Sequence, residues 1–133
     1  MTRTVDRARS LEELERDCWP APPADATRLA VTAHALRSKP IGELTIEDMR
    51  MLIRQDVGLP YLLPLALDVL RGNPLAEGDM YEGDLLSAVV TRSPAAWSEL
   101  ARLRHDLRVI VSELAAMPHV LRLDVERFLA AGR

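Results

Sequence analysis

Cysteine is almost absent from this sequence, because Cys18 is the only one among 133 residues. A lone cysteine excludes an intramolecular disulfide and a cysteine-based zinc site, and we expect Cys18 to be a small, partly buried apolar residue. The first ten residues are polar and charged, so they do not resemble a secretory signal. No apolar run approaches the roughly 18 residues that indicate a membrane-spanning helix. We therefore predict a soluble cytoplasmic protein.

Aromatic residues are also scarce, and positive charge is not in excess over negative charge. Aromatic side chains make up 4% of the chain, so the core must be built from Leu, Val, Ile and Ala, which suits helices. The net charge of -3 opposes non-specific binding to nucleic acid, because a phosphate-binding surface needs excess positive charge. A chain of this length with 48% hydrophobic residues can form one core. We predict one domain over residues 1–133, with residues 1–9 as a mobile tail, and no nucleic-acid or membrane partner.

The segment from Leu59 to Leu70 is apolar on every side of a helical wheel, and Asp68 is its only charge. A helix of this kind belongs in an interior, and it is too short for a bilayer, which requires about 20 residues. We therefore expect a central core helix over residues 59–71. Pro64 predicts either a kink or a helix that begins near it, because a proline ring clashes with the carbonyl group four residues earlier.

Two capping boxes predict helix starts. In each, the hydroxyl group of the N-cap accepts a hydrogen bond from the third helical amide, and an acidic side chain returns to the N-cap amide. The pairs are Ser10 with Glu13 and Thr45 with Asp48. The first helix must be short, because three prolines follow it closely. The second is expected to end in a left-handed cap at Gly58.

Apolar spacings and further N-cap residues predict four more helices. Asp25 would cap a helix over residues 26–37, with Leu29 on its apolar stripe, and Asp84 would cap a helix over residues 85–91. The other two are expected over residues 95–117, the longest, and 120–130. No stretch alternates apolar and polar residues long enough for a strand. The prediction is an all-α fold, a compact single-domain bundle of six or seven helices around the central apolar helix.

Catalytic and metal-binding motifs are missing as well. The sequence has no nucleophile elbow, no phosphate-binding loop, no zinc-protease motif and no Cys-x-x-Cys pair. The histidines, His34, His105 and His119, lie far apart, and none has a second ligand at metal-binding spacing. We therefore expect no enzymatic activity, no metal site and no cofactor.

An acidic, glycine-containing loop over residues 75–84 is the one polar cluster that capping alone does not explain. Its spacing does not fit a calcium-binding loop. Two interpretations remain: a solvated loop whose last residue caps a helix, or a protein-binding patch in which acidic groups steer a basic partner and a tyrosine anchors it. The candidate binding residues of the loop are Glu77, Asp79, Tyr81, Glu82 and Asp84. A second exposed face would comprise Glu47, Arg50 and Arg54.

Three segments in a fixed order carry a family resemblance. They are SLEELERDCWP at residues 10–20, LTIEDMRMLIRQDVGLPYLLPLAL at 44–67 and NPLAEGDMYEGDLL at 73–86. Together they resemble the contact-dependent growth inhibition (CDI) immunity proteins of bacterial polymorphic toxin systems.

The resemblance implies a small cytoplasmic protein that binds and neutralises the C-terminal toxin domain, commonly a nuclease, of a cognate effector. It implies no catalytic residues. It transfers no contact residues either, because the recognition surface varies among members of the family. A helical adapter or regulator without a toxin partner is the alternative that the residues leave open.

Overall fold

The computed structural model describes residues 6–131, and within this range the chain forms helices and no β-strand. The α-helices are α1 (Leu11–Glu15), α2 (Arg28–Arg37), α3 (Ile46–Arg54), α4 (Leu59–Gly72), α5 (Asp84–Val90), α6 (Ala101–Ser112) and α7 (His119–Ala131). Two short 3-10 helices are η1 (Ile41–Glu43) and η2 (Pro94–Trp97). No helix within residues 6–131 has the length and apolar character needed to cross a membrane. The prediction of an all-α fold is confirmed.

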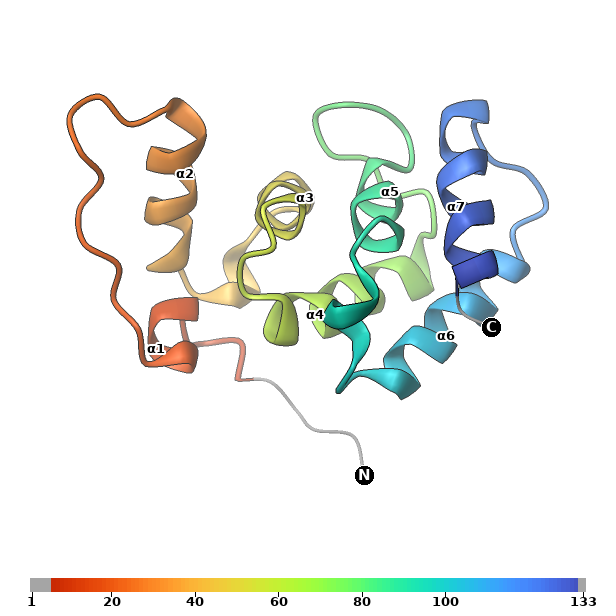
Figure 1. Ribbon diagram of the computed structural model, residues 1–133, viewed down its shortest axis with the longest axis horizontal. Coiled ribbons are helices and arrows are strands. Elements are labelled where there is room, and N and C mark those ends of the chain that lie inside the picture. Colours follow the sequence, from red (N-terminus) through yellow and green to blue (C-terminus); the bar gives the residue numbers. More distant parts are fainter. Residues whose placement is uncertain (1–5, 132–133) are drawn as a thin grey trace.

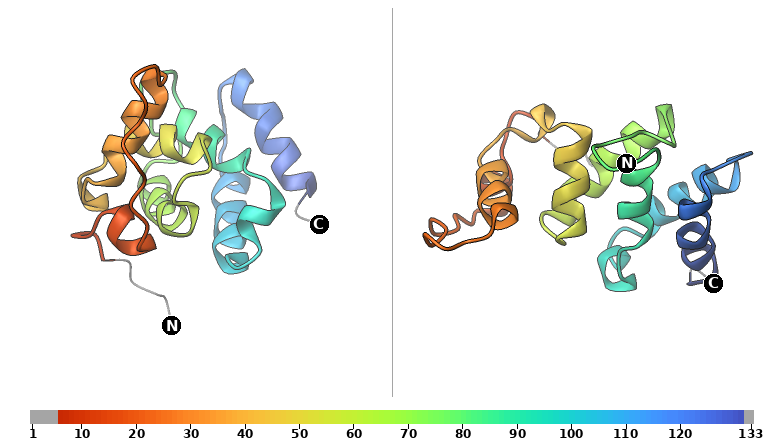
Figure 2. Two further views of the ribbon diagram at one scale, coloured as in Figure 1. Left: turned by 60° about the vertical axis from the view of Figure 1, so that its left-hand side comes forward. Right: turned by 90° about the horizontal axis from the view of Figure 1, so that it is seen from above.

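The helices α2, α3, α5 and α7 follow one another across the molecule, while α4 and α6 lie along one edge of this row (Figure 1). The view from above shows the same succession (Figure 2). Within the row, α5 packs against α3 on one side and against α7 on the other. Because α4 contacts α3, α5 and α6, it joins the N-terminal and C-terminal parts of the bundle.

The central apolar helix that the sequence predicts is α4. Its fully buried leucines are Leu62, Leu63, Leu67 and Leu70. Each such side chain stabilises the fold by roughly 1.5–3 kcal/mol relative to an exposed position. Asp68, the one charge between Leu59 and Leu70, stays exposed, and it pairs with Arg7 over 2.6 Å and with Arg71 over 2.6 Å.

Burial is even more complete in α5, where every residue from Asp84 to Val90 is buried. One side of α5 is covered by α7, which contributes the buried side chains Leu121, Val125 and Phe128. A 2.8 Å hydrogen bond from Ser87 Oγ to Asp124 Oδ2 joins the same two helices. The core therefore extends from α4 through α5 to α7.

Both predicted capping boxes are present. Ser10 Oγ accepts a hydrogen bond from the Glu13 amide over 3.3 Å, and Thr45 Oγ1 accepts one from the Asp48 amide over 3.1 Å. The two acidic side chains return to the N-cap amides over 3.2 Å and 3.0 Å. These helix starts were predictable because a capping box depends on neighbouring residues alone.

Two other helix boundaries differ from the prediction by a few residues. Thr27 rather than Asp25 is the N-cap of α2, because the Thr27 hydroxyl accepts a hydrogen bond from the Ala30 amide at 3.1 Å. Gly58 does not end α3, whose C-cap is Gln55. Instead Gly58, with a φ of 64°, is the N-cap of α4, so its left-handed geometry turns the chain between the two helices.

The helix α4 runs from Leu59 to Gly72, close to the predicted range 59–71, so of the two alternatives at Pro64 a helix start near that residue is wrong. Pro60 lies in the first turn, where a proline replaces an amide that would have no helical partner. Pro64 lies inside the helix, and it lacks the amide that would otherwise bond to the carbonyl group of Pro60. Because Pro60 is exposed, water can satisfy that carbonyl group.

The single helix predicted over residues 95–117 is also wrong. The chain leaves helical geometry at Leu100, with φ -126° and ψ 37°, so η2 and the shorter α6 replace it. The break lets Trp97 pack against Phe128 of α7, with ring centroids 6.2 Å apart. Burial of Trp97 offsets the helical hydrogen bonds lost at the break. The longest helix of residues 6–131 is therefore α4, with 14 residues.

The described residues before α1 are hydrogen-bonded to η1. The carbonyl groups of Arg7 and Arg9 accept hydrogen bonds of 2.9 Å from the amides of Gly42 and Ile41. Residues 1–5, the rest of the predicted tail, lie outside the described range.

The segment between α1 and α2, residues 16–27, runs along the outer side of α2 (Figure 1). Cys18, which we expected to be partly buried, is exposed on this segment. Leu29, expected on the buried stripe of α2, is exposed as well. Leu29 is exposed because α2 turns the face that carries Ala33 and Arg37 toward the core.

Arg37 fastens this outer segment to α2. Its side chain is only 1% exposed, and Nη2 donates a 2.7 Å hydrogen bond to Glu15 Oε1. The guanidinium carbon lies 4.2 Å from the centroid of the Trp19 ring, a distance at which the cation is attracted to the face of the ring. One charged side chain therefore ties both α1 and the segment after it to α2.

Candidate partner-binding site

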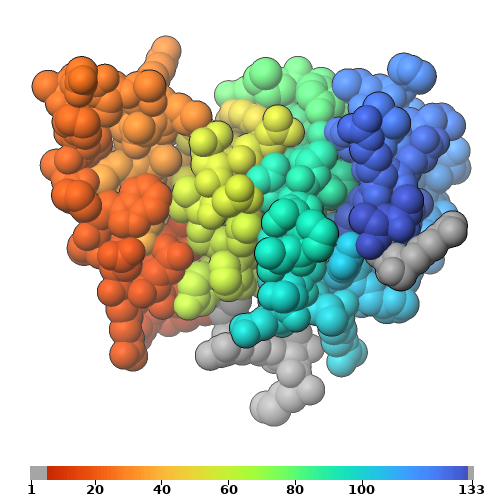
Figure 3. All heavy atoms as spheres, in the orientation of Figure 1, coloured from red at the N-terminus to blue at the C-terminus, as the bar shows by residue number. Residues whose placement is uncertain are grey.

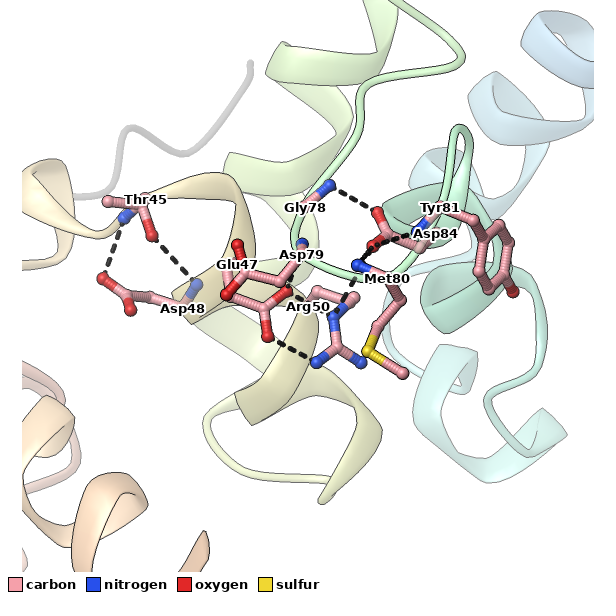
Figure 4. A network of polar contacts seen from close by, with 9 residues as sticks. All are labelled: Thr45, Glu47, Asp48, Arg50, Gly78, Asp79, Met80, Tyr81 and Asp84. Atoms are coloured by element: carbon pink, nitrogen blue, oxygen red, sulfur yellow. Dashed lines mark hydrogen bonds and ion pairs between the residues drawn. The ribbon is translucent and has the colours of Figure 1, made fainter.

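The acidic loop, residues 75–84, stands at the upper edge of the molecule in the view of Figure 3. It lies against the start of α3, because the Asp79 amide donates a 2.9 Å hydrogen bond to Glu47 Oε1. Figure 4 shows Glu47 and Arg50 of α3 directed toward the loop. The loop and part of the second predicted face are therefore one continuous surface rather than two, and the expectation that Glu47 and Arg50 are exposed is wrong, because contact with the loop leaves both side chains half-buried.

Asp84 is the residue that shapes the loop. It is the first residue of α5 and Gly83 is the N-cap, so the prediction that Asp84 caps this helix is wrong. Its carboxylate turns back and accepts hydrogen bonds from the amides of Gly78 (2.6 Å), Met80 (2.9 Å) and Tyr81 (3.3 Å). Only 3% of Asp84 is exposed. Its carboxylate therefore serves the loop's own backbone and is not presented at the surface.

Arg50 places a positive charge between two carboxylates. Its Nε and Nη2 atoms donate hydrogen bonds to the two oxygens of Glu47 over 2.6 Å and 2.5 Å. The same Nε lies 3.8 Å from Asp84 Oδ2. A two-pronged pair of this kind fixes the direction of both side chains as well as adding energy. Arg50 thereby offsets the repulsion that Glu47 and Asp84 would otherwise feel.

This arrangement changes the protonation chemistry of Glu47 and Arg50. The hydrogen bonds from Arg50 lower the pKa of Glu47, and the Asp79 amide and the nearby positive charge add to this effect, while burial opposes it. In return, the hydrogen bonds to Glu47 raise the pKa of Arg50, and Asp84 and Asp79 contribute further. Both groups therefore stay charged at neutral pH.

Gly78 passes so close to the carboxylates that a side chain at this position could not be added without a shift of its neighbours. A Cβ atom at this position would lie 2.6 Å from Glu47 Oε1 and 3.1 Å from Asp84 Oδ2. Atoms of this kind do not approach within 3.0 Å of each other, so a substitution must displace Glu47 or the loop. The glycine allows α3 and the loop to make contact.

The loop presents four side chains to solvent, Glu77, Asp79, Met80 and Glu82. Met80 is 65% exposed, and sequence reasoning missed it because the aromatic ring of the neighbouring Tyr81 is the more usual anchor. Tyr81 is only partly exposed. Arg54 is exposed at the far end of α3, where its carbonyl group accepts a 3.2 Å hydrogen bond from Arg92. The exposed part of the site is thus three carboxylates around one flexible apolar side chain.

The chemistry of this site suits binding. Within residues 6–131, His, Cys, Asp and Glu side chains do not gather in a group of three that could hold a metal ion. The Glu47 and Asp84 carboxylates are occupied by Arg50 and by backbone amides. The exposed carboxylates present negative charge from a backbone that is held in place, which complements a basic protein surface.

Comparison with known proteins gave one family. A sequence model of the family described as CDI immunity proteins matches residues 13–107. The match includes α3, α4, α5 and the whole acidic loop, and it ends within α6. A search of curated proteins found no match.

Proposed function

Because the chain belongs to the family of CDI immunity proteins, we propose that it binds the C-terminal toxin domain of a cognate CDI effector and neutralises it. The proposed partner is a nuclease domain, and the proposed place of action is the cytoplasm, where such a toxin would reach nucleic acid. The acidic loop is the proposed contact surface. It would face the basic cleft with which a nuclease holds phosphate groups.

The observation that supports this proposal is the preorganised backbone of the acidic loop. Four hydrogen bonds, three to Asp84 and one to Glu47, hold residues 78–81. A loop that is already ordered loses less conformational entropy on binding than a mobile one. Of its exposed carboxylates, Asp79 lies within this held stretch and Glu77 and Glu82 lie directly beside it, and all three can steer a basic partner before contact.

The test is co-expression of this protein with the toxin domain encoded beside its gene, followed by co-purification and a survival assay. The loop variant combines Glu77→Lys, Asp79→Lys and Glu82→Lys. The matched control combines Asp25→Lys, Glu113→Lys and Glu126→Lys, which changes the net charge equally at exposed positions outside the loop.

We expect the loop variant to lose protection and to associate with the toxin domain about tenfold to a hundredfold more slowly, because steering depends on these charges. The control variant should protect as well as the unmodified protein. Full protection by the loop variant would show that the loop is not the interface. Failure of the unmodified protein to bind the toxin domain would favour a helical adapter or regulator without a toxin partner.

A further inference from the structure

We propose that a second surface, a groove between α1, the start of α4 and η2, binds a cationic amphipathic segment of the toxin domain. This inference rests on the proposed function for the identity of the partner. The groove has a volume of about 890 Å³. The elements that form it lie along the lower part of the molecule in Figure 1, whereas the acidic loop stands at the upper edge.

The floor of the groove is apolar and firmly held. It is lined by Leu14 of α1, by Leu59, Tyr61 and Pro64 of α4, and by Leu100 before α6. The Tyr61 hydroxyl donates a 3.1 Å hydrogen bond to the carbonyl group of Leu14, which fixes α4 to α1 beneath the groove. Apolar side chains of a partner can bury themselves on this floor without first ordering it.

The rim of the groove is acidic. Its lining residues include four carboxylates, on Asp6, Glu15, Asp56 and Glu99, and one guanidinium, on Arg9. Glu99 is exposed and has no ion-pair partner among residues 6–131. The rim therefore has negative charge available for a cation from outside.

Three of the rim carboxylates already have arginine partners, at distances of 3.3 Å for Asp6, 2.7 Å for Glu15 and 2.7 Å for Asp56. The side chains of Asp6 and Asp56 are nevertheless 56% and 65% exposed. The pair of Asp6 with Arg9 is exposed on both sides and is therefore weak, so the Asp6 carboxylate can also face a cation on a bound protein. The Glu15 pair, with the buried Arg37, and the Asp56 pair, with Arg92, whose side chain is 10% exposed, are both part of the fold.

An apolar floor beneath an acidic rim defines the chemistry of the occupant. The matching segment carries apolar side chains on one face and Lys or Arg on its flanks, as in helices that bind in grooves. Charge complementarity selects such a segment over an acidic or neutral one. A basic toxin domain, which the proposed function supplies, offers surfaces of this composition.

The test uses two variants with equal changes in charge and size. The groove variant combines Ala95→Arg with Glu99→Lys, both at exposed positions that line the groove. The control variant combines Ala115→Arg with Glu113→Lys, both exposed and outside the groove. The probes are the catalytically inactivated toxin domain encoded beside the gene and a synthetic amphipathic Leu/Lys peptide, with a Leu/Glu peptide as its counterpart. Affinity is measured by isothermal titration calorimetry.

We expect the groove variant to bind both the toxin domain and the Leu/Lys peptide about tenfold or more weakly, because it blocks the floor and reverses the rim charge. The control variant should bind as the unmodified protein does, and the Leu/Glu peptide should not bind. Unchanged toxin binding by the groove variant would overturn the inference while leaving the proposed function intact.

Failure of the unmodified protein to bind the toxin domain would instead overturn the proposed function and the partner named for the groove. The Leu/Lys peptide would still decide whether the groove has the proposed chemistry. Sedimentation velocity tests a different occupant. Self-association that the groove variant abolishes would assign the groove to a second copy of this chain and overturn the inference.

Discussion

The Asp79 amide donates a 2.9 Å hydrogen bond to Glu47 Oε1, although 32 positions separate the two residues in the chain. This contact joins the acidic loop to the first turn of α3. It holds the backbone of Asp79 and leaves the Asp79 side chain exposed. The ordered conformation of the loop therefore depends on residues, such as Glu47, that are not part of its exposed surface.

Gly78→Ala should destabilise the protein by about 1–3 kcal/mol, because the new methyl group would lie 2.6 Å from Glu47 Oε1 and must displace it. Urea unfolding measures the difference. Gly72→Ala is the matched control, since among the described residues no atom beyond its own stretch of helix lies within 4 Å of a Cβ at that position. This control is helical, so it should be neutral or stabilising by about 0.5–1 kcal/mol. Equal stability of Gly78→Ala and the unmodified protein would contradict the close approach.

Asp84→Asn should also destabilise the protein, by about 1–3 kcal/mol, because a buried amide group cannot accept all the hydrogen bonds that the carboxylate accepts. The amide protons of Gly78 and Met80, which donate to Asp84, should exchange with solvent faster in this variant. Hydrogen-exchange NMR reports both sites. Asp25→Asn, at an exposed position, serves as the control, and unchanged protection at Gly78 in Asp84→Asn would show that the carboxylate does not hold the loop.

The lowered pKa of Glu47 predicts a particular dependence of stability on pH. Its ordinary pKa is 4.5, and the folded value lies below this. The unfolded state therefore binds more protons in that window, and stability rises with pH there. The stabilisation by Glu47 is fully present above pH 4.5 and is lost as the pH falls through the folded pKa.

The variant Glu47→Gln tests this dependence. Its free energy of unfolding should lie below that of the unmodified protein at neutral pH, and the gap should narrow as the pH falls below 4.5. Urea titrations at a series of pH values measure the gap. Glu113→Gln, at an exposed position, should show no comparable change. A gap that is constant across this range would exclude the ion pair as its origin.

The loss of Glu15 and the loss of Arg37 should lower the free energy of unfolding by different amounts. Glu15→Gln leaves the buried guanidinium without its carboxylate, and we expect it to cost about 1.5–3 kcal/mol. Arg37→Met removes the buried charge itself, together with two nitrogens, Nε and Nη1, that have no hydrogen-bond partner in the described part of the chain. An apolar replacement of a buried ion is often close to neutral, so Arg37→Met should cost less than Glu15→Gln. Thermal unfolding of both variants measures the difference. A larger loss of stability in Arg37→Met than in Glu15→Gln would contradict this expectation.

Local signals in the sequence predicted much of the fold. The capping boxes at Ser10 and Thr45 and the apolar character of α4 depend on residues close together in the chain, and the structure confirms them. The predicted helix over residues 95–117 failed for the opposite reason. The break at Leu100 allows Trp97 to pack against α7. The spacing of apolar residues within residues 95–117 cannot predict this contact, because its partner lies outside that range.

The site was predicted in parts but not as a whole. The composition of the loop identified its acidic residues, but it could not distinguish Asp84, which is buried, from Asp79, which is exposed. The spacing of the apolar residues in α3 left the charged residues Glu47 and Arg50 on the predicted outer face of the helix. Their actual neighbour is a loop from beyond α4. Gly78 was the one available clue to this close approach, yet glycine is common in loops simply because it adopts turn conformations without steric cost.

The match to the family ends at residue 107, whereas α7 closes the side of α5 through Leu121, Phe128 and the bond from Ser87 to Asp124. The region that the family match covers is therefore shorter than the region that is needed to complete the hydrophobic core. A chain shortened to the matched residues would lack α7. One side of α5, the most completely buried helix, would then be exposed to water. Boundaries chosen for expression should follow the packing of α7 rather than the extent of the family match.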